Sequence, residues 1–486
     1  MTQYTRRRFL EDSLLAAAAM AVSPAGKLFA QGQQQSVSPN AKLSVAVLGV
    51  NAQGNNHLKE YGKRNDVEVA YIVDADEDVG LKRVEEFAKQ YEKKPKFVQD
   101  LRRVLEDQSV DIVSIATPNH WHALAAIWAM QAGKHVFVEK PVGHNISEGR
   151  RIVETARKYN KICQAGTQIR SNPGVIDAVE YVRAGKIGEV KLARGLCYKP
   201  RTSIGARGTY YIPLNVDYDL WSGPAPIVPL SRVSLHYDWH WQWPYGDGDL
   251  GNQGIHHMDI ARWGLGEPGL SKRVFSYGGR LNFGYGEAGE TPNTMVVIHD
   301  YDDKTIAFEV RGLKTDDYKG AKVGVIFYGS EGYVVIPAYD SGTAFDPRGN
   351  IVKKFSGWGD HFGNFLNAVR SGNMEDLNSD ILQGHISTAL CHMGNISYRL
   401  GKEMSTSDLK NQLAEIKTNE NALETFDRLS AHLSSNGINV DETKLTVGPQ
   451  LIFDPESETF PDNEAANKFL TSEYRKPFAV PSAGEV

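Results

Sequence analysis

Cysteine is scarce in this chain of 486 residues. The three cysteines, Cys163, Cys197 and Cys391, stand far apart and share no spacing typical of a metal site or a redox pair. A disulfide framework is therefore unsupported, and we expect three buried thiols that act as small apolar groups.

An excess of charge of either sign is also lacking. The chain carries 54 basic and 59 acidic residues, a formal net charge of -5. This balance gives no electrostatic basis for binding nucleic acid or an anionic membrane surface. It favours a neutral small molecule as partner. The length and the 41% hydrophobic content suit two or three globular domains with a sizeable core.

The N-terminal region contains an apolar run, residues 14–22, that is too short to cross a bilayer, which takes roughly 20 residues. It follows Arg6-Arg7-Arg8-Phe9-Leu10 and precedes Leu28-Phe29-Ala30. This pattern predicts an export signal over residues 1–30 of the twin-arginine type, whose pathway carries folded proteins, followed by a polar linker over 31–41. We therefore expect a periplasmic protein without a stable membrane anchor; the alternative is a signal that stays anchored in the inner membrane.

Residues 42–165 alternate between short β-branched runs and amphipathic stretches. Strands are predicted at 43–48, 67–73, 110–116, 135–138 and 162–165, and helices at 76–91, 100–106, 121–132 and 146–159. Such alternation is typical of parallel strands joined by crossover helices. It predicts a Rossmann domain with a doubly wound parallel sheet.

The turn after the first run has the outline of a nucleotide-binding turn, Gly49-x-x-x-x-Gly54, with Asn51 in place of the middle glycine. Backbone amides at the following helix start are placed to face a pyrophosphate. Asparagine tolerates positive φ better than other non-glycine residues and offers an amide donor. By itself, the turn is equally consistent with a strand-to-helix turn that binds no phosphate.

Asp74 strengthens the nucleotide interpretation. It ends the second predicted strand, 20 residues after Gly54, where a carboxylate accepts hydrogen bonds from ribose hydroxyls. The next residues, Ala75 and Asp76, supply no cation for a 2′-phosphate. We therefore expect NAD rather than NADP.

Two further motifs, Thr117-Pro118-Asn119-His120 and Glu139-Lys140-Pro141, follow predicted strands and belong at the same carboxyl edge of the sheet. With the turn and Asp74, they resemble the Gfo/Idh/MocA oxidoreductases, relatives of glucose-fructose oxidoreductase and inositol dehydrogenase, over roughly residues 43–401. The resemblance implies an NAD(P)-dependent enzyme acting on CH–OH groups. It implies cofactor contacts from Gly49, Asn51, Gly54, Asp74, Thr117, Asn119, His122, Glu139 and Lys140.

The resemblance also implies that Lys140 lies beside the nicotinamide and contacts the reacting hydroxyl, and that the Lys140–Pro141 bond is cis. An ammonium there stabilises a developing alkoxide or relays the hydroxyl proton. In isolation, the same residue is more often a solvated loop lysine.

Residues 166–401 contain several strand-like runs without long helices between them, which predicts an antiparallel sheet. The expected fold is therefore α/β plus α+β, an N-terminal Rossmann domain with a second domain on a large, mostly antiparallel sheet. Residues 402–486 form an extension with a predicted helix at 411–433. We expect the extension to pack back on the body or to reach a neighbouring subunit.

Within the second half, residues 246–266 resemble the family segment Asp-x-Gly-x-His-x-x-Asp, with Asn252, Gly254, His256 and Asp259 at its four positions. The resemblance gives His256 the role of substrate-binding histidine and proton acceptor, which suits a group that titrates near neutral pH. Asn252 departs from the family, because an amide positions a hydroxyl but cannot ionise. Asp259 is expected to cap or orient a helix over 258–263.

Aromatic residues alternate with polar ones in residues 236–249, which predicts a strand with Trp239 and its neighbours on one face. Such rings suit the C–H face of a sugar, and a structural aromatic ladder is an equally good interpretation. Arg170 and Tyr198 are further candidates to reach the substrate. The histidines at 236, 240 and 257 follow no metal-binding spacing, so no metal is expected.

Three functions follow. The leading one is an NAD-dependent oxidoreductase that transfers a hydride between a sugar, polyol or glycoside hydroxyl carbon and nicotinamide. The alternative is an NAD-dependent glycosidase that oxidises, eliminates and re-reduces, and needs no cofactor recycling outside the cytoplasm. The third is a nucleotide-bound sugar-binding protein without catalysis. The resemblance also implies a homo-oligomer, a dimer or tetramer.

Overall fold

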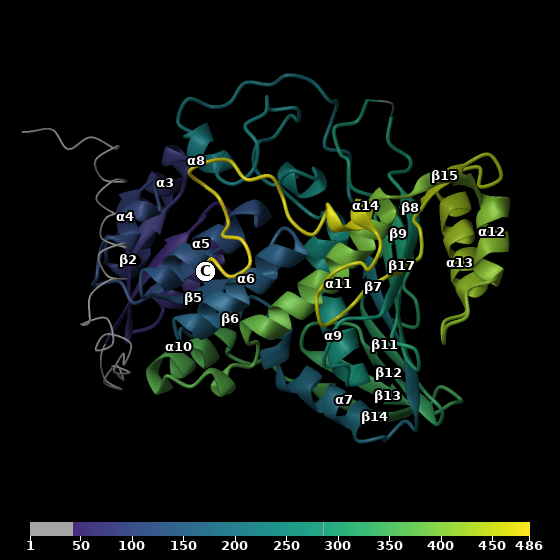
Figure 1. Cartoon of the computed structure of the whole chain (residues 1–486). Helices are drawn as coiled ribbons and strands as arrows, with labels where there is room; N and C mark the ends of the chain where they lie inside the picture. Colours follow the sequence, from purple (N-terminus) through teal and green to yellow (C-terminus); the bar gives the residue numbers. More distant parts are fainter. Residues whose placement is uncertain (1–41, 285) are drawn as a thin grey trace, which may run out of the picture.

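The computed structural model describes residues 42–284 and 286–486, which form two parts built on separate sheets (Figure 1). The expected export signal over 1–30 and the linker over 31–41 lie outside this range. Among the helices of the described residues, none combines the length and the apolar character needed to cross a membrane.

The first part is a six-stranded parallel sheet in the doubly wound order β3-β2-β1-β4-β5-β6. The strands are β1 (Leu43–Leu48), β2 (Val67–Val73), β3 (Lys96–Val98), β4 (Ile112–Ile115), β5 (His135–Val138) and β6 (Cys163–Ala165). The predicted Rossmann sheet is confirmed, and sequence missed only β3 among these strands. That edge strand has three residues, none fully buried, and so lacks the apolar run that marks the others.

Helices cover both faces of this sheet. They are α2 (Gln53–Gly62), α3 (Glu77–Tyr91), α4 (Arg102–Leu105), α5 (Asn119–Gln131) and α6 (Ile146–Lys158). A later helix, α10 (His361–Ser371), packs Phe365 and Val369 into the core formed by β1 and β2. The first core is therefore completed by residues that the predicted boundary at 165 assigns to the second domain.

The second part is an eleven-stranded, mostly antiparallel sheet, as predicted, with one parallel pair between β7 and β10. Its strands are β7 (Val190–Tyr198), β8 (Arg273–Gly279), β9 (Thr294–Asp300), β10 (Thr305–Arg311), β11 (Val323–Gly329), β12 (Gly332–Ile336), β13 (Ser341–Phe345), β14 (Ile351–Ser356), β15 (Lys402–Ser405), β16 (Lys444–Val447) and β17 (Leu451–Ile452). One face packs on α7 (Pro173–Arg183), α9 (Ile255–Leu265) and α11 (Ile381–Arg399). All three cysteines are free and buried, as expected.

A long excursion between β7 and α9 crosses to the first part. Its helix α8 (Tyr218–Ser222) lies next to the nucleotide-binding sheet at the top of Figure 1. The backbone amide of Asp217 donates to the carbonyl of Ala75, and the Trp121 indole donates to the carbonyl of Leu220. The excursion therefore brings second-domain residues over the carboxyl edge of the first sheet.

The C-terminal extension packs on both parts. Where one helix was predicted at 411–433, the structure has α12 (Thr406–Ala414) and α13 (Ala422–Ser435), which cover the outer face of β8 and β9. The yellow segment beyond them, which includes α14 (Glu464–Asn467), runs back to the first sheet (Figure 1). Phe478 is buried there against Trp121 and Trp128. The extension was expected to pack back on the body or to reach a neighbouring subunit, and the structure shows it packed on the body.

Candidate active site

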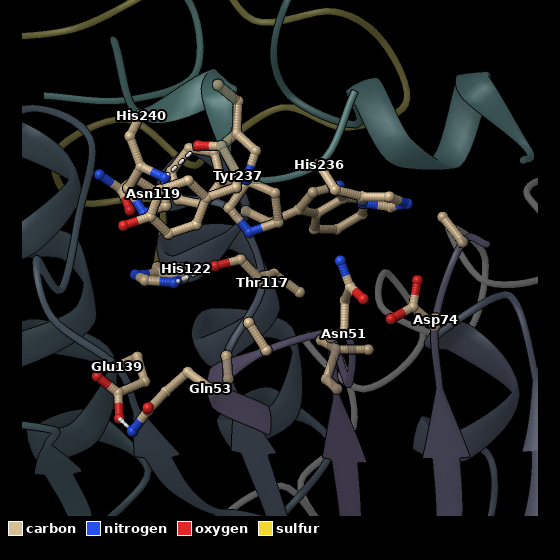
Figure 2. Close-up of a pocket in the computed structure, with 18 of the residues that line it drawn as sticks. Asn51, Gln53, Asp74, Thr117, Asn119, His122, Glu139, His236, Tyr237 and His240 are labelled. Carbon is tan, nitrogen blue, oxygen red and sulfur yellow. Dashed lines mark hydrogen bonds between the residues drawn. The ribbon is translucent and has the colours of Figure 1, made fainter. Parts of the chain in front are cut away.

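A cavity of about 570 Å³ lies at the carboxyl edge of the first sheet, between the two parts (Figure 2). Its lining combines residues after β1, β2, β4 and β5 with residues from the excursion and from α9. Ligands bind at this edge in doubly wound folds. Of the expected site residues, the lining includes Gly49, Asn51, Asp74, Thr117, Asn119, His122, Glu139, Lys140, Trp239, Asn252 and His256.

The opening turn brings backbone very close to backbone. Gly49 has φ +79°, a left-handed conformation that favours glycine, and a Cβ on Gly54 would lie 1.9 Å from the carbonyl oxygen of Gly49. The left-handed position is therefore Gly49, whereas Asn51 needs no positive φ. Asn51 faces the cavity, and its carbonyl accepts a hydrogen bond from Arg83. The tolerance of asparagine for positive φ is thus not used here.

Asp74 lies at the end of β2 beside this turn (Figure 2). Its two carboxylate oxygens accept from the backbone amides of Val50, at 2.8 Å, and Asp76, at 3.0 Å. Burial raises the pKa of the Asp74 carboxyl, against the effect of these bonds. Each oxygen keeps a second lone pair for a ribose hydroxyl, so the glycine turn and Asp74 together fit a dinucleotide.

The loop after β4 contributes Thr117, Asn119 and His122. The Asn119 amide donates to Asp247 at 2.9 Å, which ties the start of α5 to the second part. The His122 ring nitrogens lie 2.6 Å from the carbonyl oxygen of Pro141 and 2.8 Å from that of Thr117. The imidazole therefore joins the loops after β4 and β5, and both loops line the cavity.

Glu139 is held by a buried network below the cavity. Its Oε1 lies 3.0 Å from His57 Nε2 and accepts from Gln53 Nε2 at 3.0 Å, and His57 Nδ1 is 2.9 Å from the Ser114 hydroxyl. Burial alone would raise the pKa of Glu139, but the His57 bond, the charges of His57 and Lys140, and the Gln53 bond bring it to about 2. Glu139 is therefore a fixed negative charge beside Lys140.

Lys140 points across the cavity to the second part. Its Nζ donates to the carbonyl oxygen of Asn252 at 2.8 Å and lies 3.4 Å from Asn252 Oδ1. Asn252 belongs to a π-helical turn, Leu250–Gly254, of a kind frequent at functional sites. The Lys140–Pro141 bond is cis, as expected. Burial lowers the pKa of the Lys140 ammonium, against the attraction of Glu139, which favours proton exchange by this group.

His256 lies on the first turn of α9 and is 3% exposed. Within the described residues, its Nδ1 has no hydrogen-bond partner. Burial, followed by the charge of Lys140, lowers the pKa of this imidazole well below its ordinary value. His256 is therefore neutral near pH 7 and has a nitrogen available to accept a proton.

The aromatic run does not form the predicted strand. It contains a short 3₁₀ helix, Asp238–Trp241, in which Trp239 stacks on His240 at 3.6 Å between ring centroids. Because the helix turns successive rings in different directions, the expected single aromatic face is absent from this segment. Tyr237, with φ 66°, and His240 lie above Thr117, opposite the glycine turn (Figure 2).

Two expected substrate residues lie away from the cavity. Arg170 forms a buried bidentate ion pair with Asp259, at 2.6 and 2.8 Å, and Tyr198 donates to Glu309 at 2.6 Å. Asp259 therefore lies inside α9, Ile255–Leu265, as the partner of Arg170, and does not cap a helix over 258–263. The expectation that Arg170 and Tyr198 reach the substrate is therefore wrong, because each side chain is bound to a partner from a distant segment.

Other lining residues were not among the expected site residues. They include Gln53, Gln168, His236, Tyr237, His240, Gln253 and Tyr339. His236 lies 2.8 Å from Asp76, so the excursion reaches the nucleotide end of the cavity. The aromatic run signalled this segment, but the sequence carries no indication of how it folds over Asp74. Within the described range, no three His, Cys, Asp or Glu side chains are arranged to hold a metal ion.

Models of one oxidoreductase family match both parts of the chain. Residues 43–167 match its NAD-binding Rossmann fold, and residues 202–273 match its C-terminal alpha/beta domain. The first match covers the glycine turn, Asp74 and the Glu139-Lys140-Pro141 motif. The expected NAD cofactor is therefore confirmed for the Rossmann domain.

Two curated relatives act on sugars or their derivatives, according to their names. Levoglucosan dehydrogenase of Pseudarthrobacter phenanthrenivorans is 29% identical over 211 residues, which cover 41% of this chain and 47% of that protein. Alpha-N-acetylgalactosaminidase of Shewanella oneidensis is 33% identical over 152 residues, which cover 30% of this chain and 33% of that protein. The matches thus span less than half the length of these relatives.

Solved structures share the fold. GenD2 from gentamicin A biosynthesis, in complex with NAD, has a TM-score of 0.54 at 19% identity and covers 73% of this chain and 93% of its own. The WlbA dehydrogenase from Bordetella pertussis, in complex with NADH and UDP-GlcNAcA, has a TM-score of 0.55 at 19% identity and covers 74% and 97%. The family models and the curated relatives therefore support the resemblance of this chain to the Gfo/Idh/MocA oxidoreductases, with an NAD-binding Rossmann domain over residues 43–167.

Proposed function

We propose that this protein is an NAD-dependent oxidoreductase acting on a sugar, polyol or glycoside hydroxyl. The observation that supports it most is the convergence of Lys140 and His256 in one cavity with the glycine turn and Asp74. Nicotinamide, when bound, supplies the hydride acceptor. The protein's own groups then handle the proton of the hydroxyl.

Lys140 is placed to hold the substrate oxygen. Its Nζ has three donors, donates to the carbonyl oxygen and, at 3.4 Å, to Oδ1 of Asn252, and keeps the third for a ligand. The neutral His256 accepts the hydroxyl proton, and Asn252 orients the hydroxyl through its amide. Rings from Trp239 and Tyr237 in the same cavity suit the C–H face of a sugar.

The alternative function is redox-neutral glycoside cleavage with the same cofactor. The relative named alpha-N-acetylgalactosaminidase supports it, since its matched region is as similar to this chain as that of the dehydrogenase. Both reactions begin with oxidation of a hydroxyl, and both use the same two residues. The net change in NADH separates them.

The test uses the purified full chain, NAD and a panel of sugars, polyols and aryl glycosides. Net NADH absorbance with a free sugar supports the dehydrogenase, and release of the aryl group without net NADH supports the glycosidase. Lys140→Ala is expected to abolish either reaction while NAD still binds, and Lys82→Ala, an exposed lysine on α3, serves as control. NAD binding without turnover of any substrate favours the non-catalytic sugar-binding protein.

A further inference from the structure

A second cavity, of about 360 Å³, lies on the other side of the first turn of α5. Asn119 faces the dinucleotide cavity, whereas the next residue, His120, lines the second one. The walls come from the start of α6, the C-terminal half of α11, residues 224–226 and 243–247, and the C-terminal segment 468–474. Its volume is at the lower end of the range for ligand sites, roughly 300 to 1,000 Å³.

Two exposed cations line this cavity, and neither forms an ion pair within the described residues, although the charges of Asp247 and Glu290 act on Arg399. The Arg399 guanidinium lies between two rings, 4.8 Å from the centroid of Trp243 and 4.3 Å from that of Phe469, and makes no ion pair or hydrogen bond there. Lys468 also lines the cavity, and its ammonium likewise has no partner among those residues. Stacking holds the guanidinium in place and leaves its N–H edge free for a carboxylate or a phosphate.

The buried carboxylates of the cavity are already engaged. Glu148 accepts from the His144 amide at 2.7 Å, from Asn145 at 3.0 Å and from Tyr474 at 2.9 Å. Asp247 accepts from Asn119, and its Oδ1 lies 3.6 Å from His392 Nδ1. Glu473, at the mouth, is an exposed acid. The buried carboxylates therefore leave the side-chain donors of Arg399 and Lys468 without an ion-pair partner.

The lining of the cavity also includes a hydrogen-bond acceptor, the side-chain oxygen of Asn395, that receives no hydrogen bond within the described residues. Asn395 is 4% exposed; its amide nitrogen donates to the carbonyl of Asp247 at 3.0 Å, but its Oδ1 has no partner within the described residues. A buried acceptor of this kind costs roughly 1–3 kcal/mol unless a donor reaches it. A ligand hydroxyl is such a donor.

We infer that this cavity binds an anionic monosaccharide, with its carboxylate or phosphate on Arg399 and Lys468 and a hydroxyl on Asn395. Charge-assisted bonds to the guanidinium give the selectivity for an anion, and the buried acceptor gives the selectivity for a polyhydroxylated one. The site is distinct from the dinucleotide cavity and does not depend on the chemistry proposed there.

The experiment measures binding of glucuronate, glucose 6-phosphate and glucose to the full chain by isothermal titration calorimetry. We expect one anionic probe to bind at least about 10-fold more tightly than glucose, and Arg399→Gln to weaken it by roughly 10- to 100-fold. Arg348→Gln, an exposed arginine in the β13–β14 turn, is the matched control. Preference for glucuronate indicates a carboxylate ligand, and preference for glucose 6-phosphate indicates a phosphate.

His256→Ala distinguishes the two cavities, because binding in the second one survives that change. The proposal is overturned if His256→Ala loses anion binding or if Arg399→Gln binds the anion as tightly as wild type. It is also overturned if glucose binds as tightly as the anions, or if neither anion binds at millimolar concentration. Lys468→Gln, on an exposed residue, provides a second test if Arg399→Gln does not fold, and is expected to weaken the anion several-fold. Unchanged binding in a folded Lys468→Gln then overturns the proposal.

Discussion

The ammonium of Lys140 and the backbone carbonyl of Asn252 lie 2.8 Å apart, although 112 residues separate them in sequence. This bond connects the loop after β5 to the π-helical turn before α9. Lys140 and His256 line the same cavity. The geometry of the candidate site therefore depends on how the two sheets are docked.

Replacing Lys140 by methionine is expected to reduce turnover by roughly 10²- to 10⁴-fold, the contribution typical of a positioned proton-transfer group. NAD binding is expected to change little, because the glycine turn and Asp74 remain. Stopped-flow measurement of the reaction and fluorescence titration with NADH check the two parts. Turnover within a factor of two of wild type would contradict the assigned role of Lys140.

Gly54→Ala is expected to weaken NAD binding strongly, because the new Cβ would lie 1.9 Å from the carbonyl oxygen of Gly49. The turn must open to accept it, and the backbone then no longer approaches a pyrophosphate. Gly269→Ala is the control, since a Cβ at that position meets nothing within 4 Å. Calorimetric titration with NAD compares them; equal affinities show that the turn does not hold the cofactor.

Phe478→Ala is expected to destabilise the protein by roughly 3–5 kcal/mol, the usual cost of removing a buried phenylalanine. The side chain is 1% exposed and contacts Trp121 and Trp128. Urea unfolding measures the loss, and limited proteolysis reports earlier cleavage near residue 470. Trp358→Ala, at a residue 69% exposed, is the control. Equal resistance of both variants to protease means that the C-terminal segment contributes little.

Stability is expected to fall as the pH decreases from 7 to 5. Burial lowers the pKa of His120 and His299 to about 3 and that of His361 to about 4, from 6.5. Between pH 7 and 5 these histidines take up protons in the unfolded chain but stay neutral in the folded protein, so the free energy of unfolding decreases. Glu148, whose pKa burial raises to about 7, acts in the opposite direction, as do Asp74 and Asp238, whose pKa values burial also raises, but these carboxyls are fewer than the buried histidines.

Urea unfolding at pH 7, 6 and 5 measures this dependence. Each buried imidazole contributes at most roughly 1.4 kcal/mol per pH unit below its unfolded pKa. His299→Gln is expected to give a shallower decrease than wild type, since it removes one titrating group. A free energy of unfolding that rises toward pH 5 would show that the histidines are accessible to protons in the folded state.

The sequence by itself determined the first sheet and the cofactor. The β-branched run of β1 and the second half of β2 are largely buried on both faces, as is usual for parallel strands, and periodicity marked the limits of both strands correctly. The site residues of this region lie just after the ends of these strands: Gly49, Gly54 and Asp74. Local sequence is enough to place such residues, because each lies within a few residues of the element that positions it.

Only the tertiary structure decided how the rest of the site is assembled. Arg170 forms an ion pair with Asp259, and Tyr198 donates a hydrogen bond to Glu309. The aromatic run forms a 3₁₀ helix over the nucleotide turn. For Arg170 and Tyr198, a long-range partner outweighs the local pattern, since a buried charge or hydroxyl must be paired wherever the fold supplies a partner. The second cavity depends on the same long-range packing, because its walls join α6, α11 and the C-terminal segment, which no sequence pattern links.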